Sequence, residues 1–311
     1  GTFFRSRYTS TQRDKVPAEY SKKYVAIIRN YLDNFLDFPK LEWDLSGKDF
    51  TIKEYAKFIR KQWDLAEKPI SDLSILLEQQ GFVLAHYNNH SSKVDAFSGT
   101  VNINQSDYYV IMMEGEGYSF YRQQFSLAHE LGHWLLHESS ESPQSMDALE
   151  YRAMEDEANE FAAEFLLPED AFKNSVGDNV LNLDHYRYLK RFWNVSIAMM
   201  IMRAKSLGLM DSQEYTSLQR KLNYRHWRKQ EPGDTTKLIS EPVALKQGIE
   251  LLVENNIVNN IQNSIGFEYG LSLHNFMIED LVNLEPGYLT NSYYDDPKIV
   301  ELNLERIKRG R

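Results

Sequence analysis

Residues 125–137 read Phe-Ser-Leu-Ala-His-Glu-Leu-Gly-His-Trp-Leu-Leu-His. On an α-helix, residues four positions apart lie on one face, so His129 and His133 can each point an imidazole nitrogen at one cation. Glu130 follows the first histidine, where a carboxylate can take a proton from a metal-activated water. This spacing predicts a helix that carries half of a zinc-hydrolase site.

A third metal ligand has to come from elsewhere, because catalytic zinc usually has three protein ligands, and two histidines with one glutamate are an established set. Residues 155–163 read Glu-Asp-Glu-Ala-Asn-Glu-Phe-Ala-Ala and have helical apolar spacing. Glu155, at the edge of the apolar row, is the expected ligand. Glu157 points about 160° away on a wheel of about 3.6 residues per turn, so it is the alternative. Asn159 is expected to hold a ligand histidine by its free ring nitrogen.

The histidine pair also has a plain structural interpretation, because the same three positions recur in unrelated helices where the histidines only pack or face solvent. The surrounding residues favour a buried helix that shields a metal: Phe125, Ala128, Leu131, Gly132, Leu135 and Leu136. Gly132 would destabilise an exposed helix by about 1 kcal/mol relative to alanine. A glycine here predicts that another element packs close against the helix.

Other polar residues are weaker candidates. His137 is expected to cap or pack, because one straight helix cannot arrange three successive residues of one face tetrahedrally around an ion. An oxyanion that forms during hydrolysis needs a stabilising group. Spacing does not single out one of the candidates, which are His185, Tyr118, Tyr121, Tyr151 and Arg203.

The stretch from Phe125 to His137, followed by Glu-Asp-Glu-Ala-Asn-Glu-Phe-Ala-Ala-Glu-Phe-Leu-Leu-Pro at 155–168, closely resembles the ImmA/IrrE family of metallopeptidases. We expect the resemblance to extend over about residues 65–230. It implies that His129, His133 and Glu155 bind the metal and that Glu130 is the catalytic base, in agreement with the assignment from spacing.

The resemblance also implies a function in transcription regulation and stress response. Family members are intracellular, and several cleave a helix-turn-helix repressor, so such a repressor is the expected protein substrate. Many are fused to an XRE-type DNA-binding domain, and residues 1–7 look like the segment after such a domain. The alternative is a regulatory metal-binding protein, including a toxin-antitoxin component, that acts by partner binding without proteolysis. Zn²⁺ is the expected cofactor, with Mn²⁺ or Fe²⁺ as alternatives for the same donor set.

Composition and charge narrow the class of protein. The chain has 311 residues and no cysteine, which excludes disulfides and cysteine-ligated zinc. It lacks an apolar run of 18 residues and a signal-like start, so we expect a cytoplasmic protein without membrane contact. A net charge of −10 argues against direct nucleic-acid binding. Basic runs near residues 5–23 and 220–229 are interpreted as solvated faces.

The predicted fold class is α+β and mostly helical, with a minimal zincin-like core. Apolar periodicity predicts helices over 18–37, from 51, and over 71–80. Three strands, 82–87, 96–103 and 108–113, are expected to form one small sheet. An edge strand of this sheet could pair with an extended substrate, although the sequence does not say which.

Three segments are expected along the chain. They are an N-terminal helical segment at 1–64, a zincin-like metallopeptidase domain at 65–230, and a C-terminal helical interaction or sensing module at 235–311. Glu231-Pro232-Gly233-Asp234 is the predicted linker before the last segment.

Overall fold

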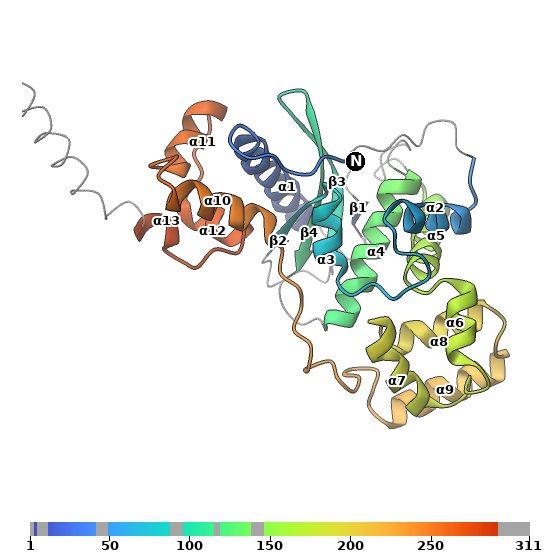
Figure 1. Ribbon diagram of the computed structural model, residues 1–311. Coiled ribbons are helices and arrows are strands. Elements are labelled where there is room, and N and C mark those ends of the chain that lie inside the picture. The colour runs from blue at the N-terminus through green and yellow to red at the C-terminus, as the bar shows by residue number, and fades with distance from the viewer. Residues whose placement is uncertain are drawn as a thin grey trace, which may run out of the picture.

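The computed structural model describes residues 3–4, 12–41, 49–87, 96–114, 119–137 and 146–291. The first half contains β1 (Phe3–Phe4), α1 (Gln12–Leu32), α2 (Ile52–Gln62), α3 (Leu73–Gln79), β2 (Val83–Tyr87), β3 (Ala96–Ile103), β4 (Ser106–Glu114) and α4 (Phe120–His137). The second half is helical: α5 (Ala148–Leu166), α6 (Glu169–Val176), α7 (Leu183–Trp193), α8 (Ile197–Ser206), α9 (Ser212–Tyr224), α10 (Ala244–Glu254), α11 (Ile261–Tyr269), α12 (Asn275–Leu281) and α13 (Tyr288–Asn291). The α+β, mostly helical prediction is confirmed (Figure 1).

The described strands form one mixed sheet in the order β1-β3-β4-β2. β3 and β4 are antiparallel and joined by a tight turn in which Asn104 and Gln105 have φ of 50° and 69°, the left-handed conformation that two-residue hairpins favour. β2 pairs with β4 in parallel, and β1 pairs with β3 antiparallel. The three expected strands are therefore present, whereas β1 was not predicted.

The two faces of the sheet contribute to two separate hydrophobic cores, because successive strand side chains point to opposite faces. Leu84 and Ile111 join the core shared with α4 and α5. Ala85 and Val110 join the core shared with α1 and the C-terminal helices. In Figure 1, α10 to α13 lie beyond α1, on the side of the sheet away from α4.

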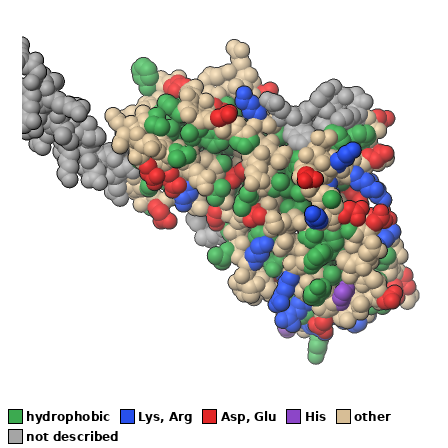
Figure 2. Space-filling model, in the orientation of Figure 1, with side chains coloured by type: hydrophobic (Ala, Val, Ile, Leu, Met, Phe, Trp, Pro, Cys, Tyr) green, Lys and Arg blue, Asp and Glu red, His purple; other side chains and the backbone are tan. Residues whose placement is uncertain are grey.

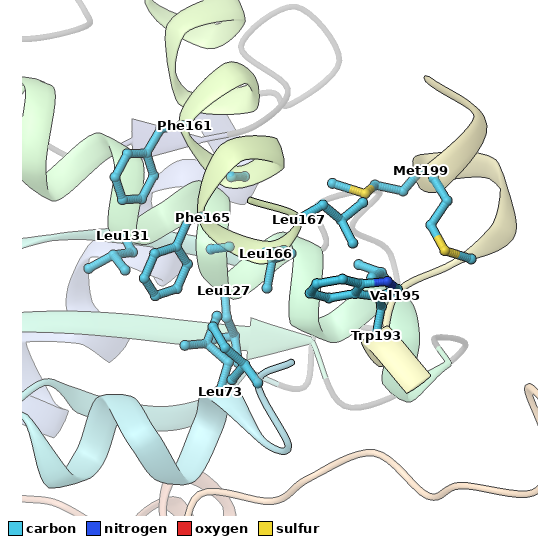
Figure 3. Close-up of a cluster of buried hydrophobic side chains, with 14 of the residues drawn as sticks. Leu73, Leu127, Leu131, Phe161, Phe165, Leu166, Leu167, Trp193, Val195 and Met199 are labelled. Carbon is cyan, nitrogen blue, oxygen red and sulfur yellow. The ribbon is translucent and has the colours of Figure 1, made fainter. Parts of the chain in front are cut away.

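The core beside α4 fixes α5 in place. Figure 3 shows Phe161 and Phe165 of α5 directed towards Leu127 and Leu131 of α4, and all four side chains are at most 1% exposed. The two phenyl rings stack with centroids 5.6 Å apart. Because burial of one such side chain stabilises by roughly 1.5–3 kcal/mol, this contact holds the two helices in one relative position.

The connection around residue 231 is not a loose linker. The carboxylate of Glu231 accepts hydrogen bonds from the backbone N–H groups of Ile197 and Ala198, at the start of α8, at 2.7 and 2.9 Å. Lys190 Nζ donates to the same carboxylate at 2.9 Å and also to Asp234. The segment is thus held against α7 and α8 before the chain continues to α10.

On the face drawn in Figure 2, Lys and Arg side chains are interspersed with Asp and Glu side chains. Among the described residues, none of the helices combines the length and apolar character that crossing a bilayer requires.

Candidate metal centre

Close contact between α4 and α5 creates the site. A Cβ added to Gly132 would lie 3.1 Å from Phe161 Cδ1 and 3.2 Å from both Cα and O of Ala158. Such distances are tighter than ordinary packing, so only glycine allows α5 to come this near. The prediction that another element packs against Gly132 is confirmed, and that element is α5.

This contact brings His129, His133 and Glu155 together. The two Nε2 atoms are 3.0 Å apart. Glu155 Oε2 lies 3.3 Å from His129 Nε2, and its Oε1 lies 3.5 Å from His133 Nε2. Among the described residues these three form the one group of histidine and acidic side chains whose ligand atoms all lie within 4.8 Å of one another. Glu157, the alternative ligand, points elsewhere.

The distances suit a tetrahedral ion. Zn–N and Zn–O bonds of about 2.0–2.1 Å place the ligand atoms of a tetrahedral site about 3.3–3.4 Å apart. The three separations lie within about 0.4 Å of that value, with one Glu155 oxygen near each histidine. The Oε1 atom of Glu155 is buried without a hydrogen-bond partner among the described residues, which a cation would compensate. This donor set therefore fits a zinc ion.

The remaining ring nitrogens of both histidines are also engaged. His129 Nδ1 lies 3.0 Å from Asn159 Oδ1, so it carries the proton and leaves Nε2 with a lone pair. His133 Nδ1 lies 3.3 Å from His137 Nδ1, and His137 Nε2 lies 2.9 Å from Glu157 Oε2. If His133 Nε2 faces a metal, the hydrogen bonds run in one direction, from His133 to His137 to Glu157. We refer to these three residues as the histidine chain.

The protonation states favour cation binding. Burial alone would raise the pKa of Glu155, but interactions with His129 and His133 outweigh it and lower the pKa below its usual range. Burial lowers the pKa of His133, although Glu155 opposes this shift. An ionised carboxylate and a neutral imidazole are the forms that ligate metal.

Glu130 lies beside this group and is held from the sheet. Its side chain is 1% exposed, and Ser98 Oγ of β3 donates a hydrogen bond to its Oε2 atom. The hydroxyl of Tyr109 lies 2.8 Å from Ser98 Oγ and donates to the backbone oxygen of Glu130 at 3.4 Å. The sheet thus fixes the orientation of the glutamate that spacing predicts as the base.

A cation from α1 also acts on Glu130. The interpretation of the first basic run as a solvated face is wrong for Lys22, whose side chain is 2% exposed. Burial lowers the pKa of Lys22, whereas charge interactions with Glu19 and Glu130 raise it. Lys22 Nζ lies 3.3 Å from Glu19 Oε2.

The oxyanion candidates are not brought together by the fold. His185 Nε2 lies 2.9 Å from the backbone oxygen of Ser175, and Arg203 pairs with Glu164. Tyr121 lies under Lys190 Nζ, 4.2 Å from its ring centroid. Tyr151 is buried beside Met154. Tyr118 lies outside the described residues.

Sequence reasoning missed Ser98 and the role of His137. Ser98 lies near the start of β3, between Phe97 and Gly99. Because strand side chains alternate between the two faces of a sheet, Ser98 lies on the same face as Tyr109 and Ile111. A hydroxyl on a buried strand face needs a partner, which was the available signal. His137 is outside the three-residue group and is packed in the interior at 5% exposure, as expected, but its hydrogen bonds to His133 and Glu157 were not predicted.

Comparison with known proteins agrees with this geometry. A search of curated proteins returned no match to the chain. The Peptidase_M78 family model, described as the IrrE N-terminal-like domain, matches residues 102–205. The match spans the end of β3 through α8 and includes His129, Glu130, His133 and Glu155. Over residues 102–205, the chain is therefore similar to the IrrE N-terminal-like domain of the ImmA/IrrE metallopeptidases.

Proposed function

We propose that this protein is a zinc-dependent endopeptidase in which His129, His133 and Glu155 hold the metal and Glu130 is the catalytic base. The observation that carries the proposal is the convergence of two imidazole nitrogens and one carboxylate from α4 and α5 within 3.5 Å of one another. The glutamate next to this group, held by Ser98, supports hydrolysis over a purely structural metal.

Each residue has a separate task in the proposed mechanism. A bound zinc supplies Lewis acidity, which polarises a peptide carbonyl and makes water more acidic. Glu130 accepts the proton of the attacking water and delivers it to the leaving amine. Ser98 holds the Glu130 carboxylate in one orientation. Asn159 and the histidine chain hold the two imidazole rings in theirs.

The metal assignment is tested by metal content. We expect about one zinc per chain in purified wild type, measured by mass spectrometry. His129→Ala and Glu155→Ala should each lose most of it, whereas Glu157→Gln should still acquire zinc when the ion is abundant. Circular dichroism provides the control for folding. Stoichiometric zinc in folded Glu155→Ala would reject Glu155 as a ligand.

We further propose that the substrate is a helix-turn-helix transcriptional repressor and that cleavage serves a stress or mobile-element response. The resemblance to ImmA/IrrE metallopeptidases supports this substrate. The test incubates zinc-loaded protein with the repressors encoded next to its gene and maps new N-termini by mass spectrometry. Wild type should cleave one repressor, and Glu130→Gln, which keeps the metal ligands, should leave it intact. Equal cleavage by both proteins would refute Glu130 as the base.

A second function, repressor binding without hydrolysis, is favoured by one observation. His129, Glu130 and His133 are at most 1% exposed, so the reaction centre is closed in this structure. If this function is correct, Glu130→Gln should switch the target genes in cells as wild type does. If folded, zinc-loaded Glu130→Gln fails to switch the target genes, this second function is excluded.

We propose that the C-terminal module at 235–311 contributes to recognition of the repressor. Support comes from the exposed aromatic side chains of Phe267 (94%) and Phe276 (65%), because exposed aromatic rings often anchor interfaces. Phe267→Ser with Phe276→Ser should weaken repressor binding to the Glu130→Gln protein without changing zinc content. Unchanged binding would remove these two residues from the interface.

A further inference from the structure

The N-terminal strand β1 occupies the outer edge of β3. Phe3 pairs with Ser98 and Phe4 with Phe97 in antiparallel register. In the sheet order β1-β3-β4-β2, β3 would be an edge strand without β1. A free strand edge presents unpaired N–H and C=O groups that accept another extended chain. The structure therefore shows this edge taking up an extended segment, and the segment belongs to the same chain.

This edge belongs to the strand that holds the side chain of the proposed catalytic base. Ser98, the residue that β1 pairs with, donates the hydrogen bond that holds Glu130. The other outer strand, β2, lies instead against α3, α10 and α12. An extended peptide on the outer edge of β3 therefore runs past Ser98 and brings its backbone near Glu130.

Among the described residues, the pairing by β1 is short. β1 covers two residues of β3, whereas β3 continues from Ala96 to Ile103. A peptide that pairs along more of β3 forms more backbone hydrogen bonds than β1 does and can displace it. The closed state of the site fits an occupied edge, since His129 and His133 are both 0% exposed.

We infer that the outer edge of β3 is the docking site for an extended substrate segment, antiparallel to β3, and that β1 is its intramolecular competitor. The inference rests on the proposed peptidase function and adds the resident occupant of the edge. In the resting protein the N-terminal strand blocks the edge. A substrate segment takes the place of β1 on this edge. Backbone hydrogen bonds hold the segment, so no particular side-chain sequence is needed.

A pair of variants of the full chain separates backbone pairing from side-chain effects. Phe3→Pro with Phe4→Pro removes both backbone N–H groups of β1, because proline has none. Phe3→Ala with Phe4→Ala keeps both N–H groups and is the matched control. We expect amide hydrogen exchange of residues 96–99 to accelerate in the proline variant and to stay near wild type in the alanine variant. Equal exchange in all three proteins would overturn the inference.

Docking is measured without hydrolysis, in the Glu130→Gln background loaded with zinc. The probe is a fluorescent peptide of residues 1–8, Gly-Thr-Phe-Phe-Arg-Ser-Arg-Tyr, and the control peptide has prolines in place of its two phenylalanines. Loss of one or two backbone hydrogen bonds corresponds to about threefold to tenfold in affinity. The proline variant should bind the probe tighter by that factor, and bound probe should restore protection of residues 96–99. Failure of the proline variant to bind better would overturn the inference.

The outcomes separate this inference from the proposed function. Tighter binding and restored protection in the proline variant, with no substrate cleaved by any zinc-loaded protein, would support β1 as occupant and reject the peptidase. Repressor cleavage by wild type, with a KM that the two proline substitutions leave unchanged, would support the peptidase and reject β1 as competitor. If both are correct, the proline variant cleaves with a KM about threefold to tenfold lower and an unchanged kcat.

Discussion

Replacement of Gly132 by alanine tests whether the close approach of α4 and α5 builds the metal centre. In a helix with free space, this change stabilises by about 1 kcal/mol. Here the new methyl group would meet Phe161 Cδ1 at 3.1 Å and Cα and O of Ala158 at 3.2 Å. Two of these atoms are backbone and cannot turn aside, so overpacking costs about 1–3 kcal/mol. We expect a net destabilisation of about 1 kcal/mol, measured by urea unfolding.

The same substitution should weaken metal binding. Ala158 follows Glu155 by one turn of α5, so a shift of α5 away from the added methyl moves the carboxylate away from the histidines. We expect about tenfold lower zinc affinity, which competition with a chromophoric chelator measures. Gly248→Ala is the matched control, because its methyl would meet only side-chain ends, those of Leu32, Phe38 and Leu36. Gly132→Ala with wild-type stability and zinc affinity would refute the reasoning.

Three further results are expected. His137→Ala breaks the histidine chain and should lower zinc affinity by about tenfold to a hundredfold in the same competition assay. Met202→Ala changes an exposed helical residue and is the control. An unchanged affinity of His137→Ala would contradict a role of the histidine chain in metal binding. Lys190→Met leaves the buried carboxylate of Glu231 without its cation, so urea unfolding should show a loss of about 3 kcal/mol, and a loss below about 1 kcal/mol would contradict this. Hydrogen bonds from Lys173 and Lys53 lower the pKa of Glu169 to about 2, so the stabilisation relative to Glu169→Gln is present above the ordinary carboxyl pKa and should vanish as the pH falls towards 2. A constant difference in unfolding midpoint between pH 6 and pH 2 would contradict that assignment.

Local sequence signals predicted the elements that carry the candidate site. Four-residue spacing brought His129 and His133 to one face, and helical geometry favoured Glu155 over Glu157. Gly132 indicated a close neighbour without naming it. In each case the interaction lies within one helix or between a helix and the element packed on it. A short stretch of sequence therefore contains the pattern that predicts it.

The contacts that depend on tertiary register could not be predicted in the same way. Ser98 is 32 positions from Glu130, and the register of β3 against α4 decides whether they meet. Lys22 has the spacing of an exposed cation, yet packing of α1 against the sheet buries it. Two residues of β1 are too short for a periodicity, and only the unsatisfied edge of β3 explains their conformation.

The donor set of the candidate site also determines its resistance to oxidation. Peroxide releases zinc from thiolate sites because it converts cysteine sulfur to sulfenic and higher acids. His129, His133 and Glu155 bring only nitrogen and oxygen to the site, and the chain has no cysteine anywhere. A peptidase with this centre would keep its metal under oxidant concentrations that strip cysteine-bound zinc.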